Sequence, residues 1–576
     1  MQNKNIKNIL SGVFIILFIS FLLIANFMEK NKKVVKTVSY TNKEDFNENK
    51  YGLFLSSLHA NFNGDYDKLS SFYDEAVKQN NNDFLGRLFI LQSTNENRDE
   101  VLKLALSEYK KNNQNIVPVM YLANDYFVKK QYSKSLQLLN NLKGKSDTFI
   151  VKLLKAWNLT AQKKYDDALD LLETELDNKA FRKYVLMHLG AIAEIADDKS
   201  YATEIYEEVL KTERVNIFDI ENISSFYLRS KNQKQAVKVI SDYYAKMPDS
   251  VSVLMLLNDV RDGLYTPVSI DTANKGMAKA IFDISSIFSS VFASSQDLHL
   301  MYLTMIDDLY PDFYMSILVK SEVYKNLNKP ALFFKYSNKV PEDNYLYTTS
   351  KLNEALYYLQ SDTTKDKGLG IFNNLISKYP NIPQLYFRLG SYYQNNKDYV
   401  QAIDNYSKAL SFADSDKLKG DIYFARAQIY DIDKNTENAK NDLEEAFKLK
   451  DINPVFLNYY GYFLINNNLD LDKGLDLISR AVANEPTNPF FLDSFGWALF
   501  KKGDFEKSLK LLELAKSIEP KNPVIIDHLA DVYWSLNRKR EAVFEWQKAL
   551  SFKDYNKNSI EPININKIEY KINYGL

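Results

Sequence analysis

The stretch that decides the fold runs from Pro454 to Tyr555, and its centre, from Pro489 to Pro520, reads PFFLDSFGWALFKKGDFEKSLKLLELAKSIEP. Small residues recur in it at a fixed period, because Ala481, Ala515 and Ala549 are spaced by 34 and 34 residues. Two antiparallel helices can cross closely only where small residues let their backbones approach, and large apolar residues then fill the remaining space. One such hairpin cannot bury its apolar face alone, so the period predicts a stack of helical hairpins in which each contacts its neighbours.

Other positions of the stretch share this period. Gly461, Gly496 and Ala530 take an equivalent place in successive units, and Pro486 and Pro520 close two of the units. The pattern resembles the tetratricopeptide repeat (TPR), which combines an aromatic residue, Leu-Gly, Tyr, two spaced alanines and a closing proline. This resemblance implies an all-α fold, a right-handed α-solenoid of about fourteen TPR-like hairpins of roughly 34 residues each.

Two upstream regions repeat the same signal. Ala168, Ala202 and Ala236 are again spaced by 34 and 34 residues. The run Tyr386-Phe387-Arg388-Leu389-Gly390, with Ala402 after it, is close to the full tetratricopeptide pattern. These signals predict one array of hairpins before the middle of the chain and another after it.

The segment 259–344 breaks the rhythm. Within it, the run from Gly276 to Ala293 is apolar on more than one side. We interpret this run as a buried helix where the solenoid changes pitch, with a partner-binding or dimerisation insert as the alternative. A second membrane span is not expected, because Lys279 and Asp283 interrupt the run and charges inside a membrane are costly.

The N-terminus carries a different signal. Ile9 to Met28 is an uncharged apolar run of twenty residues, long enough to span a bilayer as a transmembrane helix or to form the core of a signal peptide. Ala25-Asn26-Phe27 is a poor cleavage site, which favours an uncleaved anchor. Four lysines follow between Lys30 and Lys36, so the positive-inside rule does not favour export of the C-terminal side.

The last residues follow a third pattern. Ile563, Ile565, Ile568, Tyr570 and Ile572 mostly alternate with polar residues, which is the period of a strand. We therefore predict an extended tail that folds back over the last hairpin, or else a free tail. The predicted segments are a basic N-terminal segment (1–8), a transmembrane anchor or signal peptide (9–28), a polar tether (29–50), an N-terminal array (51–258), an irregular helical segment (259–344), a C-terminal array (345–556) and an extended tail (557–576).

Composition argues against several classes of function. Lysine and arginine total 73 against 74 acidic residues, so no basic charge points to nucleic acid. The absence of cysteine excludes disulfides, thiolate zinc sites, a cysteine nucleophile and lipoprotein acylation. The four histidines stand apart and match no ligand spacing. We predict no catalytic, cofactor or metal site and no small-molecule substrate, with an enzyme site in 259–344 as the alternative.

The resemblance also implies where partners bind. In a tetratricopeptide array, positions 2, 5, 9 and 12 of the unit, here counted from Pro489 and Pro523, point from the first helix into a concave groove. The predicted partner-binding residues are Phe490, Asp493, Trp497, Phe500, Asp527, Asp531 and Trp534, with Val524 among them. This aromatic and acidic surface suits basic or apolar segments of other proteins. The alternative is that both tryptophans pack hairpin on hairpin.

A narrower resemblance rests on Asp493 to Trp497, His528 to Trp534 and Glu541 to Trp546. These runs look like long bacterial envelope TPR proteins, which include lipoprotein adaptors of carboxyl-terminal processing proteases. The resemblance implies a non-enzymatic scaffold or adaptor in the periplasm, whose partners are proteins such as an envelope protease or its substrates. The chain has no cysteine to acylate, so an inner-membrane anchor at 9–28 would replace the lipid. Export after signal cleavage and a position on the cytoplasmic face stay open as alternatives.

Overall fold

The computed structural model describes residues 98–144, 148–212, 215–266, 268, 270–291, 296–449, 453–555 and 563–576. The predicted basic segment, membrane anchor and tether, and the first part of the N-terminal array, lie outside the described residues. Within the described part, no helix is both long and apolar enough to cross a membrane. The chain divides into two units, 1–122 and 123–576, and the packing below concerns the second unit.

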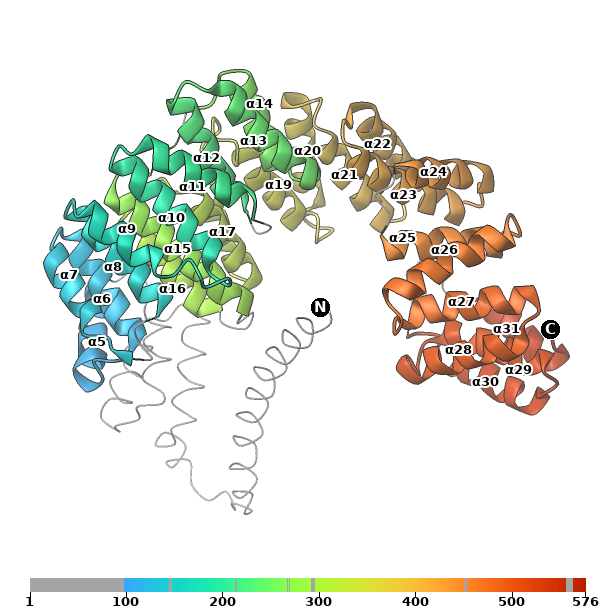
Figure 1. Ribbon diagram of the computed structural model, residues 1–576. Helices are drawn as coiled ribbons and strands as arrows, with labels where there is room; N and C mark the ends of the chain where they lie inside the picture. Colours follow the sequence, from blue (N-terminus) through green and yellow to red (C-terminus); the bar gives the residue numbers. More distant parts are fainter. Residues whose placement is uncertain are drawn as a thin grey trace, which may run out of the picture. The chain divides into compact units, whose positions relative to one another are not determined.

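The described residues form 27 helices and no strand (Figure 1). The helices are α5 (Arg98–Lys111), α6 (Ile116–Val128), α7 (Tyr132–Asn140), α8 (Phe149–Ala161), α9 (Tyr165–Glu173), α10 (Arg182–Ile195), α11 (Lys199–Leu210), α12 (Ile217–Arg229), α13 (Gln233–Lys246), α14 (Val251–Arg261), α15 (Ala273–Val291), α16 (Gln296–Ile306), α17 (Tyr314–Asn326), α18 (Pro330–Ser337), α19 (Tyr347–Tyr358), α20 (Lys365–Lys378), α21 (Pro383–Asn395), α22 (Tyr399–Phe412), α23 (Asp416–Ile432), α24 (Thr436–Lys448), α25 (Pro454–Asn466), α26 (Leu471–Asn484), α27 (Pro489–Lys502), α28 (Phe505–Ile518), α29 (Pro523–Ser535), α30 (Lys539–Ser551) and α31 (Ile565–Tyr574).

Local sequence sets where the hairpins of the C-terminal array begin and turn. Asn488 and Asn522 cap α27 and α29, since each side chain accepts backbone N–H groups of the first turn. Pro489 and Pro523 follow at the first helical position, where a missing N–H costs nothing. Gly503 ends α27 with φ 85°, a left-handed conformation that favours glycine. The caps at Asn488 and Asn522 therefore start the first helices of two successive hairpins.

The two helices of each hairpin cross closely at the small residues. A Cβ added to Gly496 of α27 would lie 2.7 Å from Leu512 Cγ of α28. Ala481, Ala515 and Ala549 are fully buried. Helices α21 to α30 pack as consecutive pairs, and each pair packs on the next, with α23 and α24 joined to α25 and α26 through one buried apolar cluster. The predicted all-α stack of hairpins is confirmed for the described residues.

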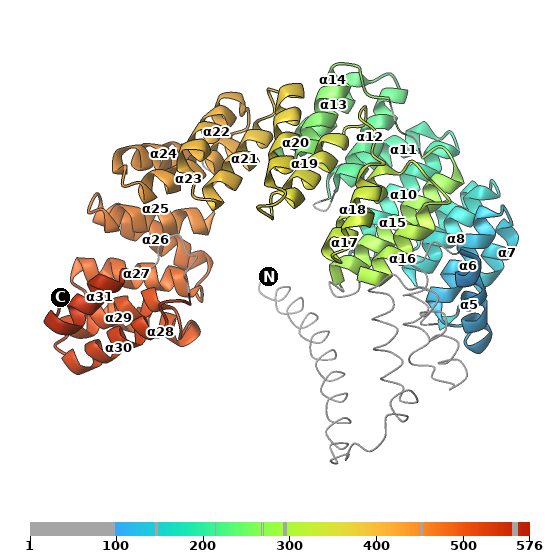
Figure 2. The same ribbon diagram turned by 180° about the vertical axis from the view of Figure 1, so that it is seen from behind.

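The segment 259–344 folds back on the earlier hairpins. Its longest helix, α15, packs against α8 and α10, while α14 packs against α19 (Figures 1 and 2). Gly276 of α15 lies so close to Trp157 of α8 that an added Cβ would meet the indole ring at 2.0 Å. The interpretation of this run as a buried helix holds for Gly276 to Ser285, and the burial comes from contact with other helices of the same chain.

Buried charges pair across this contact. Lys279 of α15 lies 3.2 Å from Asp219 of α12 and 2.5 Å from Asp283. Lys183 of α10 lies 2.9 Å from the other oxygen of Asp219. Each cation faces a carboxylate, which offsets the cost of removing these charges from water. A shift of α15 would leave charges buried and unpaired, so the network holds α15 in one register.

His188 of α10 completes the contact. Trp157 donates its indole N–H to His188 Nδ1 at 3.1 Å, and His188 Nε2 lies 3.1 Å from Asp283. Because the indole can only donate, Nδ1 must accept and Nε2 must carry the proton. Burial lowers the pKa of His188, although Asp283 opposes this effect. A neutral histidine therefore joins α8, α10 and α15.

The prediction of an extended tail is wrong. Residues 565–574 form the helix α31, capped by Asn564, whose side chain accepts the N–H of Lys567. Lys571 and Ile572 follow Ile568 by three and four residues, so all three share one helical face. That face packs against α30 and its neighbours, with Ile568 and Lys571 buried. The isoleucines satisfy both a strand period and a helical period, and the available surface selects the helix.

We expect Gly276→Ala to loosen the contact between α15 and α8, because the fully buried Trp157 ring leaves no room for a methyl group. Amide hydrogen exchange measured by mass spectrometry should rise in α8, α10 and α15. Gly370→Ala in α20 is the matched control, since nothing lies within 4 Å of its added Cβ. That control should stabilise its helix by up to about 1 kcal/mol. Equal exchange in both variants would contradict the close contact.

Candidate functional site

The predicted partner-binding residues lie on α27 and α29, but they differ in exposure. Phe490 is 52% exposed, whereas Trp497 is 7% exposed. The Trp497 ring stacks on His528 of α29, with centroids 4.2 Å apart, and on Phe500, with centroids 5.0 Å apart. The structure thus places Trp497 between two hairpins, which fits the packing alternative for this residue. Its role as an anchor for a partner stays a prediction.

Asp493 is also engaged within the chain. Its carboxylate lies 2.9 Å from Nδ1 of His528. Burial disfavours the charged imidazole, but Asp493 outweighs this effect and raises the pKa of His528. The pair therefore joins α27 to α29 beside the stacked tryptophan. The sequence analysis selected Asp493 but not its histidine partner.

The remaining predicted residues are covered by the C-terminal helix. Lys571 of α31 lies 2.7 Å from Asp527 and 2.7 Å from the nearer oxygen of Asp531. The indole of Trp546 donates to Asp531 at 2.9 Å. Gly575 approaches Trp534 so closely that an added Cβ would lie 2.1 Å from the indole. Asp527, Asp531 and Trp534 thus contact the chain's own α31.

A cavity of about 440 Å³ lies between α19 and α21. Pro383 and Pro489 begin α21 and α27, so residues 106 apart take the same repeat position in the two helices. By this count, the equivalents of Phe490, Asp493 and Trp497 are Gln384, Phe387 and Ser391. The residues that line this cavity include Leu356, Leu359, Gln360, Gln384, Phe387 and Arg388. The sequence pattern predicts this repeat, but the predicted partner-binding residues lie only in the last two hairpins.

Gln384 lines this cavity and has an acceptor atom that no described residue uses. Its Nε2 donates to Pro248 O at 2.6 Å and to Tyr244 Oη at 3.1 Å. A carbonyl oxygen can only accept, so the group beside Pro248 must be the NH₂ and the amide orientation is determined. Gln384 is 1% exposed, and its Oε1 has no hydrogen-bond partner among the described residues. A buried polar atom without a partner is uncommon, and this one belongs to a residue that lines a cavity, so its oxygen is a candidate acceptor for a bound group.

Arg388 adds an unused donor, one helical turn from Gln384. Its Nε is buried and, within the described part of the chain, also has no hydrogen-bond partner. Leu356, Leu359 and Phe387 supply apolar surface in the same cavity. The cavity therefore offers an acceptor, a charged donor and apolar contacts together.

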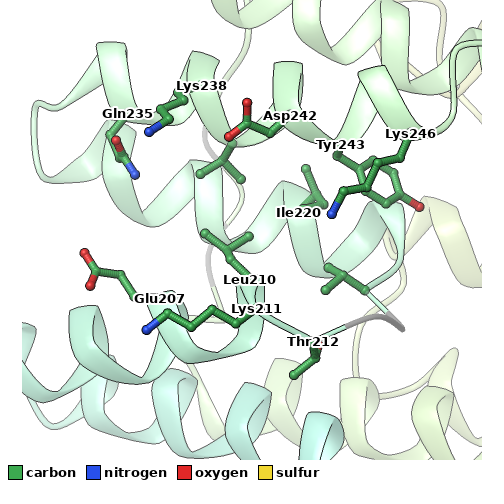
Figure 3. Close-up of a pocket in the computed structure, with 12 residues that line it drawn as sticks. Glu207, Leu210, Lys211, Thr212, Ile220, Gln235, Lys238, Asp242, Tyr243 and Lys246 are labelled. Atoms are coloured by element: carbon green, nitrogen blue, oxygen red, sulfur yellow. The ribbon is translucent and has the colours of Figure 1, made fainter.

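A second hollow, of about 350 Å³, lies between α11, α12 and α13 (Figure 3). Lys211, Lys238 and Lys246 share it with Glu207 and Asp242, and all five side chains are exposed. Charges of both signs on exposed side chains are typical of a solvated surface. Nothing in the described residues groups three or more potential metal ligands.

Two of the hairpins match a known repeat family. Residues 383–416 and 420–453 match the family model of the tetratricopeptide repeat. Among solved structures, the chain is similar to the APC/C hetero-tetramer Cut9–Hcn1, at 14% identity over 88% of this chain and 89% of that one, with a TM-score of 0.33. YrrB, a TPR protein with an unusual peptide-binding site, matches at 18% identity over 32% of this chain and 94% of its own, with a TM-score of 0.27. PilW, a type IV pilus biogenesis factor, matches at 22% identity over 30% of this chain and 77% of its own, with a TM-score of 0.28.

We expect Lys571→Met to destabilise the last hairpin by about 3 kcal/mol or more, because it leaves two carboxylates without their buried cation. Burial and Asp527 raise the pKa of Asp531 even though Lys571 opposes them. When the pKa of a carboxyl group is higher in the folded than in the unfolded state, the protonated group favours folding. That contribution to stability is present at low pH and is lost as the pH rises and the group ionises. The deficit of the variant should therefore be smaller at about pH 4 than at about pH 7.

Urea denaturation monitored by tryptophan fluorescence measures this deficit. Lys567→Met is the matched control on the exposed face of α31 and should behave as wild type. A deficit that does not depend on pH would contradict the role given to the two carboxylates.

Proposed function

Because residues 383–416 and 420–453 are tetratricopeptide repeats, we propose that the chain is a protein-binding scaffold that holds an extended segment of a partner protein in the cavity between α19 and α21. Such repeats generally form non-catalytic interaction surfaces. The observation that carries the proposal is the buried, unpartnered Oε1 of Gln384 in one of the matched repeats. An extended backbone has free N–H groups, and one of them can donate to this oxygen.

The rest of the cavity suits the same ligand. Arg388 Nε can donate to a carbonyl or carboxylate of the bound segment, and a carboxylate gives the stronger, charge-assisted bond. A neighbouring side chain of the segment would pack on Leu356, Leu359 and Phe387. Backbone contacts would give affinity, while the apolar surface and Arg388 would select the sequence.

The groove predicted on α27 extends this proposal. Val455 of α25 is 57% exposed and Phe490 of α27 is 52% exposed, at the first groove position of their hairpins. A longer partner would add apolar contacts there. Trp497 and Asp493 are both buried, so they would not contact the partner widely. They would instead hold α27 against α29 through His528.

We further propose that the scaffold works as an adaptor in the bacterial envelope, held at the inner membrane by residues 9–28. The narrower family resemblance supports this role, and an envelope protease or its substrates are the partners that it implies. The lysines after residue 28 support the opposite orientation, in which the scaffold faces the cytoplasm.

Site-specific photo-crosslinking tests the cavity. A crosslinker placed at Asn395, at the edge of the cavity, should capture partner proteins that mass spectrometry identifies. Arg388→Ala should weaken the binding of a captured segment at least about tenfold, which corresponds to about 1.4 kcal/mol. Lys397→Ala, an exposed charge deletion just beyond α21, is the matched control and should bind as wild type. Unchanged binding by folded Arg388→Ala would overturn the cavity as the binding site.

A reporter fusion tests the orientation. We expect alkaline phosphatase fused after Leu576 to be active, because this enzyme needs export to fold with its disulfides. Activity of a reporter that works only in the cytoplasm would contradict the periplasmic location. That result would exclude periplasmic partners, but it would not contradict the proposal that a partner binds in the cavity between α19 and α21.

A further inference from the structure

A third cavity, of about 270 Å³, lies where both ends of the segment 259–344 meet α12. The rings that line it belong to Phe218, Tyr310, Phe313, Tyr314 and Tyr345. The buried carboxylate of Glu221 joins them from α12, one helical turn after Phe218, and the exposed carboxylate of Asp312 lies at the cavity edge. The volume lies just under the range of pockets for drug-sized molecules, about 300 to 1,000 Å³, so the cavity suits a small group.

Glu221 is held by two tyrosines. Tyr265 donates to its Oε1 at 2.8 Å, and Tyr345 donates to its Oε2 at 3.0 Å. Tyr265 lies near the start of the segment 259–344 and Tyr345 directly follows its end, so one carboxylate binds both ends of the segment. Glu221 is 5% exposed. Burial raises its pKa to about 7, although the two tyrosines oppose this effect.

The neighbouring cations already have their own counter-ions. Lys275 lies 3.0 Å from Asp271, and Lys279 is paired with Asp219 and Asp283. In the described residues, no lysine or arginine forms an ion pair with Glu221. The carboxyl group of Glu221 is therefore held by the hydroxyls of Tyr265 and Tyr345, with no cation paired to it in the described part of the chain.

The aromatic walls are suited to positive charge. The face of an aromatic ring is negative and attracts ammonium groups, and cages of several rings recognise alkylated ammonium. The molecule itself shows this attraction, because Lys275 Nζ lies 5.3 Å from the centre of the Tyr310 ring and Lys279 Nζ lies 5.4 Å from that of Phe218. The empty space beside these rings is bordered by Glu221.

We propose that this cavity binds an alkylammonium cation, with Glu221 as its counter-ion and the rings of Phe218, Tyr310 and Phe313 as its walls. The cation is either the end of a lysine side chain from a protein or a free quaternary ammonium compound, which share this chemistry. The site is separate from the cavity on α21 and does not depend on the function proposed for it. Because both ends of the segment 259–344 meet at Glu221, the ligand would also strengthen the attachment of that segment to α12.

Binding should depend on pH through Glu221. The titratable and charged groups around it are Tyr265, Tyr310, Tyr314 and Tyr345, with Lys275 and Asp312 at the cavity edge. Burial raises the pKa of each of these tyrosines above its ordinary value, so none of the four loses its proton near pH 7. A cation favours the ionised carboxylate, so binding below about pH 7 must release a proton. Affinity therefore rises with pH until Glu221 is ionised in the free protein.

Isothermal titration calorimetry of the full chain tests this site with two probes, tetramethylammonium chloride and Nα-acetyl-lysine amide. We expect saturable binding of at least one probe, about tenfold tighter at pH 8 than at pH 6, because Glu221 titrates near pH 7. At pH 6, titrations in buffers of different ionisation enthalpy should show proton release. Tighter binding of tetramethylammonium would indicate a free small molecule, and tighter binding of the lysine probe would indicate a protein partner. Absence of saturable binding by both probes at pH 8 would overturn the proposal.

Variants separate the site from general effects. Glu221→Gln should abolish both the binding and the proton release, whereas Glu354→Gln should leave them unchanged. Glu354 is the matched control, since it is 6% exposed, accepts from Ser337 and Lys351, and lies outside the cavity. If Glu221→Gln fails to fold, Tyr310→Leu replaces it and should weaken binding several-fold while the pH dependence remains. Wild-type affinity in folded Glu221→Gln or in Tyr310→Leu would overturn the proposal.

Discussion

The close crossing of two helices within each hairpin is the constraint on which the rest of the structure depends. Glycine or alanine at the crossing brings the backbones together, as at Gly496 and Ala515. A larger side chain there would force the helices apart and cost free energy through displaced neighbours. The same crossing determines which side of the first helix faces the second helix, and so which side faces away from it. Gln384 and Phe490 are the second residues of α21 and α27, so they lie on equivalent sides of their helices.

The chain covers part of its own repeat surface. Helix α15 lies against α8 and α10, and α31 lies against the last hairpin. Each covering helix carries a buried lysine: Lys279 of α15 pairs with Asp219 of α12, and Lys571 of α31 pairs with Asp531 of α29. A buried ion pair adds little net stability but strongly disfavours any arrangement that leaves one partner alone. These pairs therefore specify where each covering helix lies more than they stabilise it.

Unused polar atoms distinguish the cavity between α19 and α21 from these covered surfaces. Asp527 and Asp531 have Lys571, and Asp493 has His528, so their bonding capacity is met within the chain. Gln384 Oε1 and Arg388 Nε have no such partner among the described residues. Burial of an unmet donor or acceptor costs about 1 to 3 kcal/mol, which a ligand that supplies the partner recovers. The cavity on α21 is thus the better candidate for binding than the aromatic groove that the repeat pattern indicates.

The sequence by itself determined the repeat unit and hence the helical hairpins, because a 34-residue period of small residues reports a local crossing between neighbours in the chain. It also indicated a buried helix from Gly276 to Ala293, since the run is apolar on several sides, and the structure bears this out for Gly276 to Ser285. Only the tertiary structure decided what covers these surfaces. Trp157 meets Gly276 and Asp531 meets Lys571 across 119 and 40 residues of chain, and no periodic signal links such positions. The helical form of α31 was likewise decided by packing, because its isoleucines fit a strand as well as a helix until a surface is present to bury one face.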